Sequence, residues 1–507
     1  MTVNSRVPSL GSAPWSLTLR LLVSIAGESM IFTALGHNSF IISHDESSLL
    51  IDPLLQTGFG DEYSPKPIKM YPPRSIDASA LQNVDAILIS HEHFDHFNLA
   101  SLNLLPRSIP VLVGVTMISA VVSAIESLGF TVTRVPFEER LLVGALSICL
   151  YPPTPDTVHW EKRVTQLIVT DSDGVSLLVG IDAMVGEAII EAATTNLASA
   201  VVVSNNAQIT PPGVMGTLTN FGEAADSTPQ VAALSIVDAL LTYLAGSPEL
   251  QARPILISGG GFQKDYEEMG PFPFSDQDEI ARLTRELTGR DDVFGPLPGE
   301  VLEVTKDGVQ PAGRVKWIHL DREALATAQR GRDEFITSGQ PITRRPLLPP
   351  VDDPDAALKK VENELNAFAQ AVLMSKLSAE MLERWHPATG CFFIRVVDEG
   401  TSTVVDYSLD LVTSAFVRND QFIHLDDFSL AQTSPFGFII SLGDFVGLID
   451  GTIQIWDLAG LAVNTWFRNS RTEAVMPLMY SWFGEQAAPH LANRLFRLQL
   501  NMLGVKA

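Results

Sequence analysis

Short apolar runs, each ended by Gly, Asn or Asp, dominate the chain from Met30 onward. The first four cover residues 31–35, 40–43, 48–52 and 86–90. Runs of this length, with turn residues between them, are typical of β-strands. The first half of the sequence therefore predicts a fold that is rich in β-sheet.

Helical periodicity alternates with these strands farther along the chain. The ranges 117–128 and 227–245 predict helices. Further strands are expected at residues 131–135, 146–151, 166–170, 176–181, 200–204 and 254–258. The run at 176–180 is almost entirely apolar, which is typical of a strand that is buried on both faces. We therefore expect a mixed α/β fold in which helices cover the sheets.

A proline-rich stretch at residues 338–354 divides the chain. It reads SGQPITRRPLLPPVDDP, a composition typical of a linker. The sequence therefore predicts an N-terminal extension over residues 1–29, a main domain over 30–337 and a C-terminal α+β domain over 355–507.

The C-terminal domain is expected to open with a helix and to continue with strands. The helix covers residues 355–373, and the strands are predicted at residues 391–397, 402–409, 436–440 and 451–457. Residues 442–451 are interpreted as a turn between apolar strands. A long apolar helix is expected over residues 473–502, interrupted at Pro477 and Pro489. Its apolar stripe suggests core packing or a homodimer contact.

Composition excludes several classes of protein. Hydrophobic residues make up 46% of the chain and charged residues 18%, as in a globular protein. The net charge of −25 disfavours nucleic acid as a partner, because phosphate binding needs clustered Lys and Arg. Prolines, glycines and polar residues interrupt the longest apolar runs, so we expect neither a membrane span nor a membrane partner. With only Cys149 and Cys391, a disulfide framework is excluded and a cytoplasmic location is expected.

Three of the ten histidines lie within six positions, in the segment His91-Glu92-His93-Phe94-Asp95-His96. This segment directly follows the apolar strand 86–90. In an extended loop His91 and His93 point to the same side and can bind one cation. Asp95 and His96 diverge toward a second position. This arrangement suits two metals that lie about 3.5 to 4 Å apart. Histidines satisfied by hydrogen bonds in the core are the alternative, but four ligand-type residues so close together favour a metal site.

This segment matches the H-x-H-x-D-H motif of the metallo-β-lactamase superfamily. The segments LGHNSFII at 35–42 and LIDP at 50–53 resemble the opening hairpin of one branch of that superfamily. That branch contains enzymes similar to ascorbate-6-phosphate lactonase, N-acyl-phosphatidylethanolamine phospholipase D and sialic-acid hydroxylase. The resemblance extends from Met30 to about Arg330. It implies a four-layer αββα sandwich, here followed by an additional C-terminal α+β domain.

The resemblance also implies the remaining metal ligands. His159 stands where the family has its next histidine, although it could instead stack on Trp160 in a turn. Asp182 stands where the family has an acid that bridges two metals, although it could instead cap a helix that starts near Ala183. The expected metal ligands are therefore His91, His93, Asp95, His96, His159 and Asp182.

The last family ligand, a histidine after a late strand, has no counterpart. The matching strand at 254–257 is followed by Ser-Gly-Gly-Gly-Phe. Asp265, Glu267 and His319 are possible substitutes, and the second metal position stays open. Substrate contacts are expected from His37, Asn205 and Gly260, and Asp52 is expected to support the ligands through hydrogen bonds.

Two reactions fit such a site, which would hold one or two ions of zinc, iron or manganese. We favour hydrolysis of a small-molecule ester, lactone, amide or phosphodiester, in which Asp95 orients the attacking hydroxide. The alternative is a diiron oxygenase, since histidine and carboxylate ligands with open positions also suit iron. A third reading is a non-catalytic member that only binds a ligand.

Overall fold

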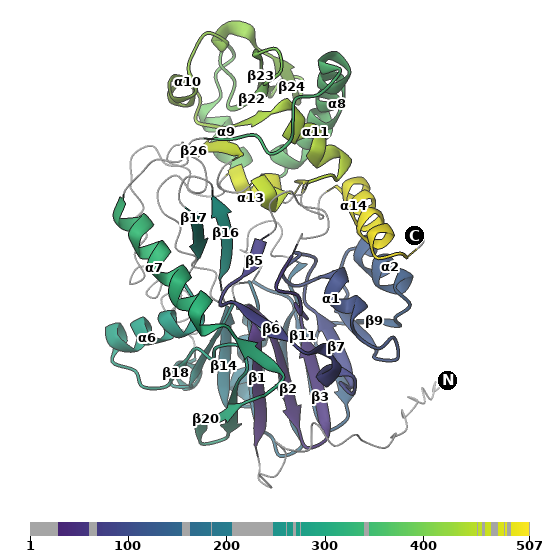
Figure 1. Ribbon diagram of the computed structural model, residues 1–507, viewed down its shortest axis with the longest axis vertical. Coiled ribbons are helices and arrows are strands. Elements are labelled where there is room, and N and C mark those ends of the chain that lie inside the picture. The colour runs from purple at the N-terminus through teal and green to yellow at the C-terminus, as the bar shows by residue number, and fades with distance from the viewer. Residues whose placement is uncertain are drawn as a thin grey trace.

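The computed structural model describes the greater part of the chain. The described residues are 29–59, 68–154, 163–183, 185–204, 247–259, 261–266, 270–273, 275–338, 344–453, 455–458, 462–467, 475–480, 482–483 and 488–505. They form a lower body with two stacked sheets and a smaller body above it (Figure 1).

The first sheet of the lower body has eight strands and contains the opening hairpin. The four strands at one side of this sheet, β3, β7, β8 and β9, run parallel, so their carboxyl ends meet at one edge. In spatial order the strands are β20 (Gly308–Arg314), β19 (Glu300–Thr305), β1 (Met30–Gly36), β2 (Ser39–His44), β3 (Ser47–Ile51), β7 (Ala86–Ile89), β8 (Val111–Gly114) and β9 (Val132–Val135).

The second sheet has seven strands and packs against the first. Here β13, β14, β15 and β18 run parallel. In spatial order the strands are β10 (Arg140–Val143), β11 (Leu146–Tyr151), β12 (Gln166–Thr170), β13 (Ser176–Val179), β14 (Ala200–Ser204), β15 (Ile255–Ser258) and β18 (Val293–Phe294).

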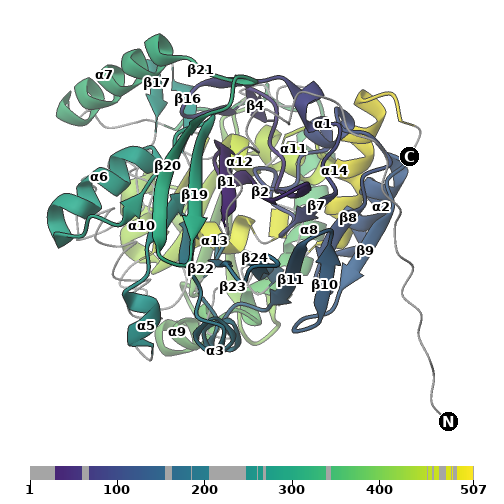
Figure 2. The same ribbon diagram turned by 90° about the horizontal axis from the view of Figure 1, so that it is seen from below.

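Alternating side chains of the two sheets build three separate apolar layers. Phe32 and Leu88 of the first sheet share a buried cluster with Leu177 of the second, between the sheets. The outer face of the first sheet packs on α1 (Leu99–Asn103) and α2 (Ser119–Ser127). The outer face of the second packs on α3 (Glu187–Thr195), α5 (Pro248–Gln251) and α6 (Gln277–Thr288) (Figure 2). The predicted αββα sandwich is therefore confirmed.

Two small sheets accompany the two large ones. One orders β17 (Gly270–Pro273), β16 (Phe262–Tyr266), β5 (Ile68–Met70) and β4 (Gly58–Phe59), and the other pairs β21 (Ile318–Leu320) with β6 (Arg74–Ile76). The 3-10 helix η2 (Ala78–Leu81) and the long helix α7 (Arg322–Ser338) complete the lower body.

The upper body is the expected C-terminal α+β domain. A five-stranded sheet packs against helices around its own apolar core. The strands, in spatial order, are β24 (Ala415–Arg418), β23 (Thr403–Asp410), β22 (Phe392–Asp398), β25 (Phe436–Ser441) and β26 (Val463–Phe467). The helices are α8 (Pro354–Leu373), α9 (Leu377–Arg384), η4 (Asp420–Phe422), α10 (Asp427–Thr433), α11 (Leu442–Asp450), α12 (Ile455–Leu458), α13 (Val475–Tyr480) and α14 (Pro489–Met502).

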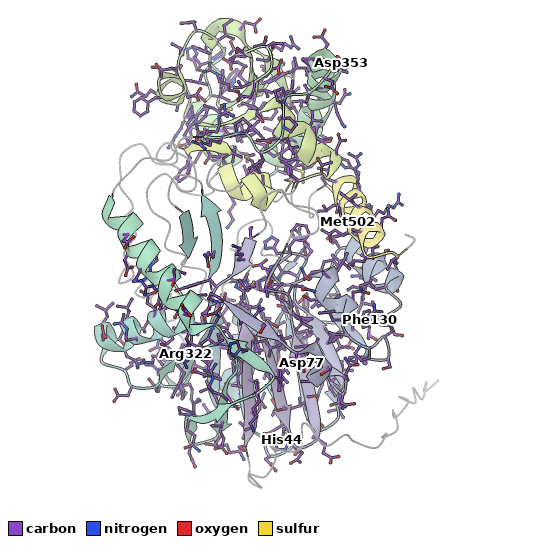
Figure 3. The ribbon with its side chains drawn as sticks, in the orientation of Figure 1. His44, Asp77, Phe130, Arg322, Asp353 and Met502 are labelled. Carbon is purple, nitrogen blue, oxygen red and sulfur yellow. The ribbon has the colours of Figure 1, made fainter. Side chains whose placement is uncertain are left out.

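The last helix, α14, leaves the upper body and lies against the lower one. Ala492, Leu495 and Phe496 share a buried cluster with Val121 of α2. The view with side chains shows Met502, at the end of α14, on the same side of the molecule as Phe130, whereas His44 lies at the opposite end from Asp353 (Figure 3). α14 thereby joins the two bodies through apolar contacts.

Two expectations for the C-terminal domain are wrong. Residues 442–451 form the helix α11 rather than a turn, because the Ser441 hydroxyl caps its first turn and Gly451, at φ 75°, ends it. The predicted strand 451–457 overlaps the short helix Ile455–Leu458. The predicted helix 227–245 lies outside the described residues. No described helix is both long and apolar enough to cross a membrane.

Candidate metal centre

The histidine motif begins where β7 ends, at the edge to which the parallel strands of both sheets point. Asp52 directly follows β3, Ser90 follows β7, and Asp182 lies just beyond the end of β13. The motif then turns back on itself, since the amides of His96 and Phe97 both donate to the carbonyl of His93. Loops after parallel strands are where α/β proteins place their sites. Here the loop after β7 carries His91, His93, Asp95 and His96, and the loop after β13 carries Asp182.

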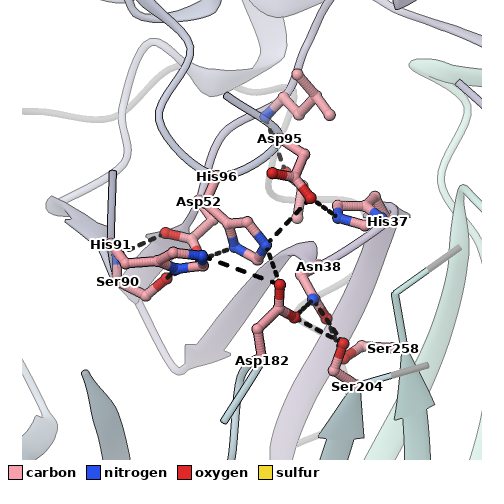
Figure 4. Close-up of polar contacts among 12 residues, drawn as sticks. His37, Asn38, Asp52, Ser90, His91, Asp95, His96, Asp182, Ser204 and Ser258 are labelled. Carbon is pink, nitrogen blue, oxygen red and sulfur yellow. Dashed lines mark hydrogen bonds and ion pairs between the residues drawn. The ribbon is translucent and has the colours of Figure 1, made fainter. Parts of the chain in front are cut away.

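His96 is at the centre of the cluster and contacts three carboxylates. Its Nδ1 lies 2.7 Å from Oδ2 of Asp52, and its Nε2 lies 2.8 Å from Oδ2 of Asp182. Oδ2 of Asp95 lies 3.5 Å from the same Nε2 (Figure 4). Asp52 therefore fixes the ring orientation, and Nε2 of His96 faces both Asp95 and Asp182.

The carboxylate of Asp182 is oriented by hydrogen bonds to its other oxygen. The side-chain amide of Asn38 donates to Oδ1 over 2.5 Å, and the hydroxyl of Ser204 donates to the same oxygen over 2.7 Å. Oδ2 is thereby directed toward His96, and it also lies 4.0 Å from Nε2 of His91. Asp182 does not cap a helix, because α3 begins at Glu187 with Gly186 as its N-cap.

His91 is held by a short relay that ends on Asp52. Nδ1 of His91 lies 3.0 Å from the hydroxyl of Ser90, which donates to Oδ2 of Asp52 over 2.5 Å. This leaves Nε2 of His91 on the side of the ring that faces Asp182. The ring of His93 stacks edge-on against that of His91, with centroids 4.7 Å apart. Asp52 thus supports two imidazoles, as expected from its position.

His37 and Asp95 form the opposite side of the cluster. Nε2 of His37 lies 2.8 Å from Oδ2 of Asp95. Oδ1 of Asp95 is buried and has no hydrogen-bond partner among the described residues. Both side chains are almost completely buried. The expected contact of His37 with substrate is not tested by this arrangement, in which His37 is a close neighbour of Asp95.

Burial and charge shift the pKa values of the cluster in opposite directions. Burial lowers the pKa of His91 well below its usual range, and it also lowers the pKa of His93. Burial also acts to lower the pKa of His96, but Asp182, Asp95 and Asp52 outweigh it and raise that pKa well above its usual range. Burial acts to raise the pKa of Asp95, but His96 and His37 hold it well below its ordinary value.

These donors fit a divalent metal ion. Two groups, His37 with Asp95 and His96, and His91 with His96 and Asp182, each offer ligand atoms that lie within 4.8 Å of one another. All five side chains are buried, and the neighbouring carboxylates raise the pKa of His96. The cluster therefore favours positive charge. Imidazole nitrogens and carboxylate oxygens are ligands of zinc, iron and manganese alike. The cluster can therefore hold a cation, with its identity open.

The structure places only some of the residues expected from the sequence. His91, His93, Asp95, His96, Asp182 and His37 come together, whereas His159, Asn205, Gly260 and Glu267 lie outside the described residues. Asp265 is on β16. His319 is exposed on β21 and does not belong to either ligand group. It is therefore no substitute ligand in this arrangement.

Three polar residues around Asp182 were not expected from the sequence. Asn38 and Ser204 donate to its carboxylate, and Ser258, the last residue of β15, donates to Oδ1 of Asn38 over 2.6 Å. Ser204 and Ser258 share one signal in the sequence, which is their position, because each ends a parallel strand at the same edge. A single serine is too common for that signal to identify it.

Comparison with known families supports the identification of the fold. Residues 32–164 match the family model described as "Beta-lactamase superfamily domain". This match covers the opening hairpin and the histidine motif, and it confirms the resemblance noted above; the particular branch is not established. A search of curated proteins gave no significant match.

Solved structures resemble this chain only distantly. Isothiocyanate hydrolase from Delia radicum gut bacteria is 18% identical over 54% of this chain and 98% of its own, with a TM-score of 0.37. The metallo hydrolase Igni18 from Ignicoccus hospitalis is 16% identical over 54% of this chain and 98% of its own, with a TM-score of 0.32. CmlA, a diiron β-hydroxylase from Streptomyces venezuelae, is 16% identical over 46% of this chain and 45% of its own, with a TM-score of 0.29. Similarity at this level does not indicate the reaction.

Proposed function

Because the chain carries a metallo-β-lactamase superfamily domain whose family match covers residues 32–164, we propose that it is a metal-dependent hydrolase of a small-molecule ester, lactone, amide or phosphodiester. One observation supports this proposal above the others. The ligand atoms of His91, His96 and Asp182 lie within 4.8 Å of one another, at the edge where the parallel strands end. A bound divalent cation would lower the pKa of coordinated water toward about 7 and polarise a substrate oxygen.

Hydrogen bonds from the surrounding residues orient the ligand atoms of this group. Hydrogen bonding to Asp52 turns Nε2 of His96 toward the centre, and Ser90 does the same for His91. Asn38 and Ser204 hold one oxygen of Asp182, which leaves the other directed at His96. Such supporting contacts stabilise ligand orientation, and their loss typically weakens metal binding by about 10- to 100-fold.

We assign to Asp95 the orientation of the attacking water. Its pKa is held well below the ordinary range, so it is ionised at neutral pH. Oδ1 is available to accept a hydrogen bond from a water molecule and so orient it, while His37 holds Oδ2. Loss of this orientation would misplace the attacking water, and a misplacement of about 1 Å can cost about 10²-fold in rate.

Metal depletion and reloading test this proposal. We expect the chain stripped with a chelator to lose hydrolysis of at least one of p-nitrophenyl acetate, a simple lactone and bis(p-nitrophenyl) phosphate. Addition of Zn²⁺ or Mn²⁺ is expected to restore that activity, and Asp95→Asn is expected to lower it by about 10²-fold. No metal-dependent hydrolysis of any of these compounds, or an Asp95→Asn variant as active as wild type, would contradict the proposal.

A diiron or mononuclear iron oxygenase is the second candidate. The observation that favours it is the composition of the two ligand groups, each of which has two histidines and one carboxylate. Two histidines and one carboxylate with open positions are the ligand set of non-haem iron oxygenases. Iron retained after aerobic purification, with oxygen uptake that needs a reductant, would support this candidate; zinc or manganese without iron would support the hydrolase.

A further inference from the structure

The missing last histidine of the family has a neighbour that can replace it. We propose that His37, from the turn between β1 and β2, is a ligand of a second metal position together with Asp95 and His96. This inference rests on the proposed metal centre and extends it from one position to two. It also replaces the substrate contact that the sequence suggested for His37.

The three donor groups already converge. Nε2 of His37 lies 2.8 Å from Oδ2 of Asp95, which lies 3.5 Å from Nε2 of His96. The rings of His37 and His96 are inclined at 68°, with centroids 5.4 Å apart. The exposed fractions of the three residues are 5%, 5% and 0%. Such burial leaves little of His37 for contact with a substrate, whereas a metal ion needs only the one nitrogen.

The backbone places His37 beside the strand end that lacks the family ligand. β15 ends at Ser258, where no histidine follows, and the amide of the next residue, Gly259, donates to the carbonyl of His37 over 3.0 Å. The hydroxyl of Ser258 donates to Asn38, the other residue of the same turn. The turn that carries His37 is therefore hydrogen-bonded to the end of β15, where the family histidine is missing.

The backbone conformation of His37 is unusual for a residue with a side chain. Its φ is 53°, in the left-handed region, where glycine is the least strained residue. Asn, Asp and His tolerate this region better than other residues do. Strained positions that keep a side chain often lie at functional sites. A histidine at this position is consistent with a role for its ring.

The second position completes a division of ligands between the two sites. His91 and one oxygen of Asp182 serve the first position, His37 and Asp95 serve the second, and His96 belongs to both ligand groups. His96 faces both Asp95 and Asp182 across distances of 3.5 and 2.8 Å, so the two positions adjoin. Two metal ions held at these adjoining positions would stabilise charge on the attacking and leaving oxygens of a substrate.

Substitution of His37 and measurement of metal content test the inference. His37→Asn and His37→Gly both remove the imidazole, and both tolerate a positive φ, so the turn is preserved. The matched control is His319→Asn, because His319 is exposed on β21 and outside both ligand groups. Each metal-free protein is titrated with Mn²⁺ or Zn²⁺ by calorimetry, and the bound metal is counted by elemental analysis after dialysis. Thermal melting of the metal-free proteins checks that the fold is intact.

We expect wild type and His319→Asn to bind two equivalents. The two His37 variants should bind one, with the second dissociation constant raised at least about tenfold, a loss comparable with removal of a supporting contact. Added imidazole is expected to restore the second equivalent in His37→Gly but not in His37→Asn, where the asparagine side chain remains.

Two outcomes would overturn the inference in distinguishable ways. His37 is not a ligand if both His37 variants bind two equivalents of metal with unchanged affinity. The same follows if wild type binds a single equivalent that these substitutions do not alter. Either result leaves the proposed hydrolase in place. A wild-type chain that binds no divalent metal at all would overturn the proposed function as well.

Discussion

The ring of Phe97 packs edge to face against the ring of Phe496, with centroids 5.3 Å apart and planes at 79°. Phe97 directly follows His96 in the histidine motif, whereas Phe496 lies on α14, the last helix of the chain. Both side chains are almost completely buried. The C-terminal domain thus contacts the residue next to a predicted metal ligand, which links the two bodies at the site.

The first prediction concerns this contact. Phe496→Ala should destabilise the protein by about 3–5 kcal/mol, because it removes a buried aromatic ring and leaves a cavity. Because the motif then loses a packing partner, metal binding should also weaken. Phe428 of α10 is 54% exposed, so Phe428→Ala is the matched control and should change stability by less than about 0.5 kcal/mol. Thermal melting and metal titration measure both effects; unchanged metal affinity in a destabilised Phe496→Ala variant would show that the contact serves stability alone.

The second prediction concerns the residue beneath the ligands. Asp52 accepts hydrogen bonds from His96 and from the hydroxyl of Ser90. Asp52→Asn should therefore lower metal affinity by about 10- to 100-fold without removing a ligand. Asp85, at the opposite end of β7, bonds to Ser48, and Asp85→Asn is the control that should leave the metal affinity unchanged. Equal affinities in the two variants would exclude a supporting role for Asp52.

The third prediction uses a buried carboxyl group away from the site. Asp276 caps α6 by accepting from the amide of Glu279, and burial raises its pKa from 3.8 to about 6. Between these two values the folded state binds more protons than the unfolded state, so the free energy of unfolding falls as pH rises through this window. Asp276→Asn keeps a good cap and removes the titration.

The expected result is a difference between variant and wild type that changes with pH. From pH 4 to pH 7 Asp276→Asn should gain up to about 3 kcal/mol relative to wild type, as a shift of this size implies. Melting temperatures of the two metal-free proteins across that range give the measurement. A difference that stays constant from pH 4 to pH 7 would show that Asp276 titrates normally.

The fourth prediction concerns the C-terminal domain. Arg395 and Asp406 form a buried bidentate ion pair at 2.9 Å. Asp406→Ala leaves the guanidinium buried without that partner and should cost about 3–5 kcal/mol. Asp427, which is 42% exposed and lies 3.3 Å from Arg395, provides the control, and Asp427→Ala should cost less than about 1 kcal/mol. Chemical unfolding monitored by tryptophan fluorescence distinguishes the two; similar losses would argue against a special role for the buried pair.

Sequence patterns predicted the strands better than the connections between them. The strands Gln166–Thr170 and Ala200–Ser204 were expected at those bounds, because apolar residues end abruptly at turn residues there. Helix α11 was missed because its sequence is apolar nearly all round, and its caps, Ser441 and Gly451, resemble the ends of a turn. Local patterns do not distinguish a short buried helix from a strand.

The same contrast holds for the candidate site. The spacing from His91 to His96 predicted ligand-type residues on one loop, and the resemblance to the metallo-β-lactamase superfamily predicted Asp182 at the end of a strand. The proximity of His37 to Asp95 could not be predicted, because it depends on how β1 and β7 are arranged within one sheet, with β2 and β3 between them. The hydrogen bond from Gly259 to His37 joins the two different sheets and has no local signal at all.

The most direct test of the central claim is the metal content of the purified chain, measured by elemental analysis beside an Asp182→Asn variant. Asparagine has the same shape as aspartate, but it lacks the negative charge that lies 2.8 Å from His96. We predict at least one equivalent of zinc, iron or manganese per wild-type chain and the loss of one equivalent or more in the variant. Equal metal content in the two proteins, or no metal in wild type after incubation with these ions, would contradict a metal centre at this edge of the sheets.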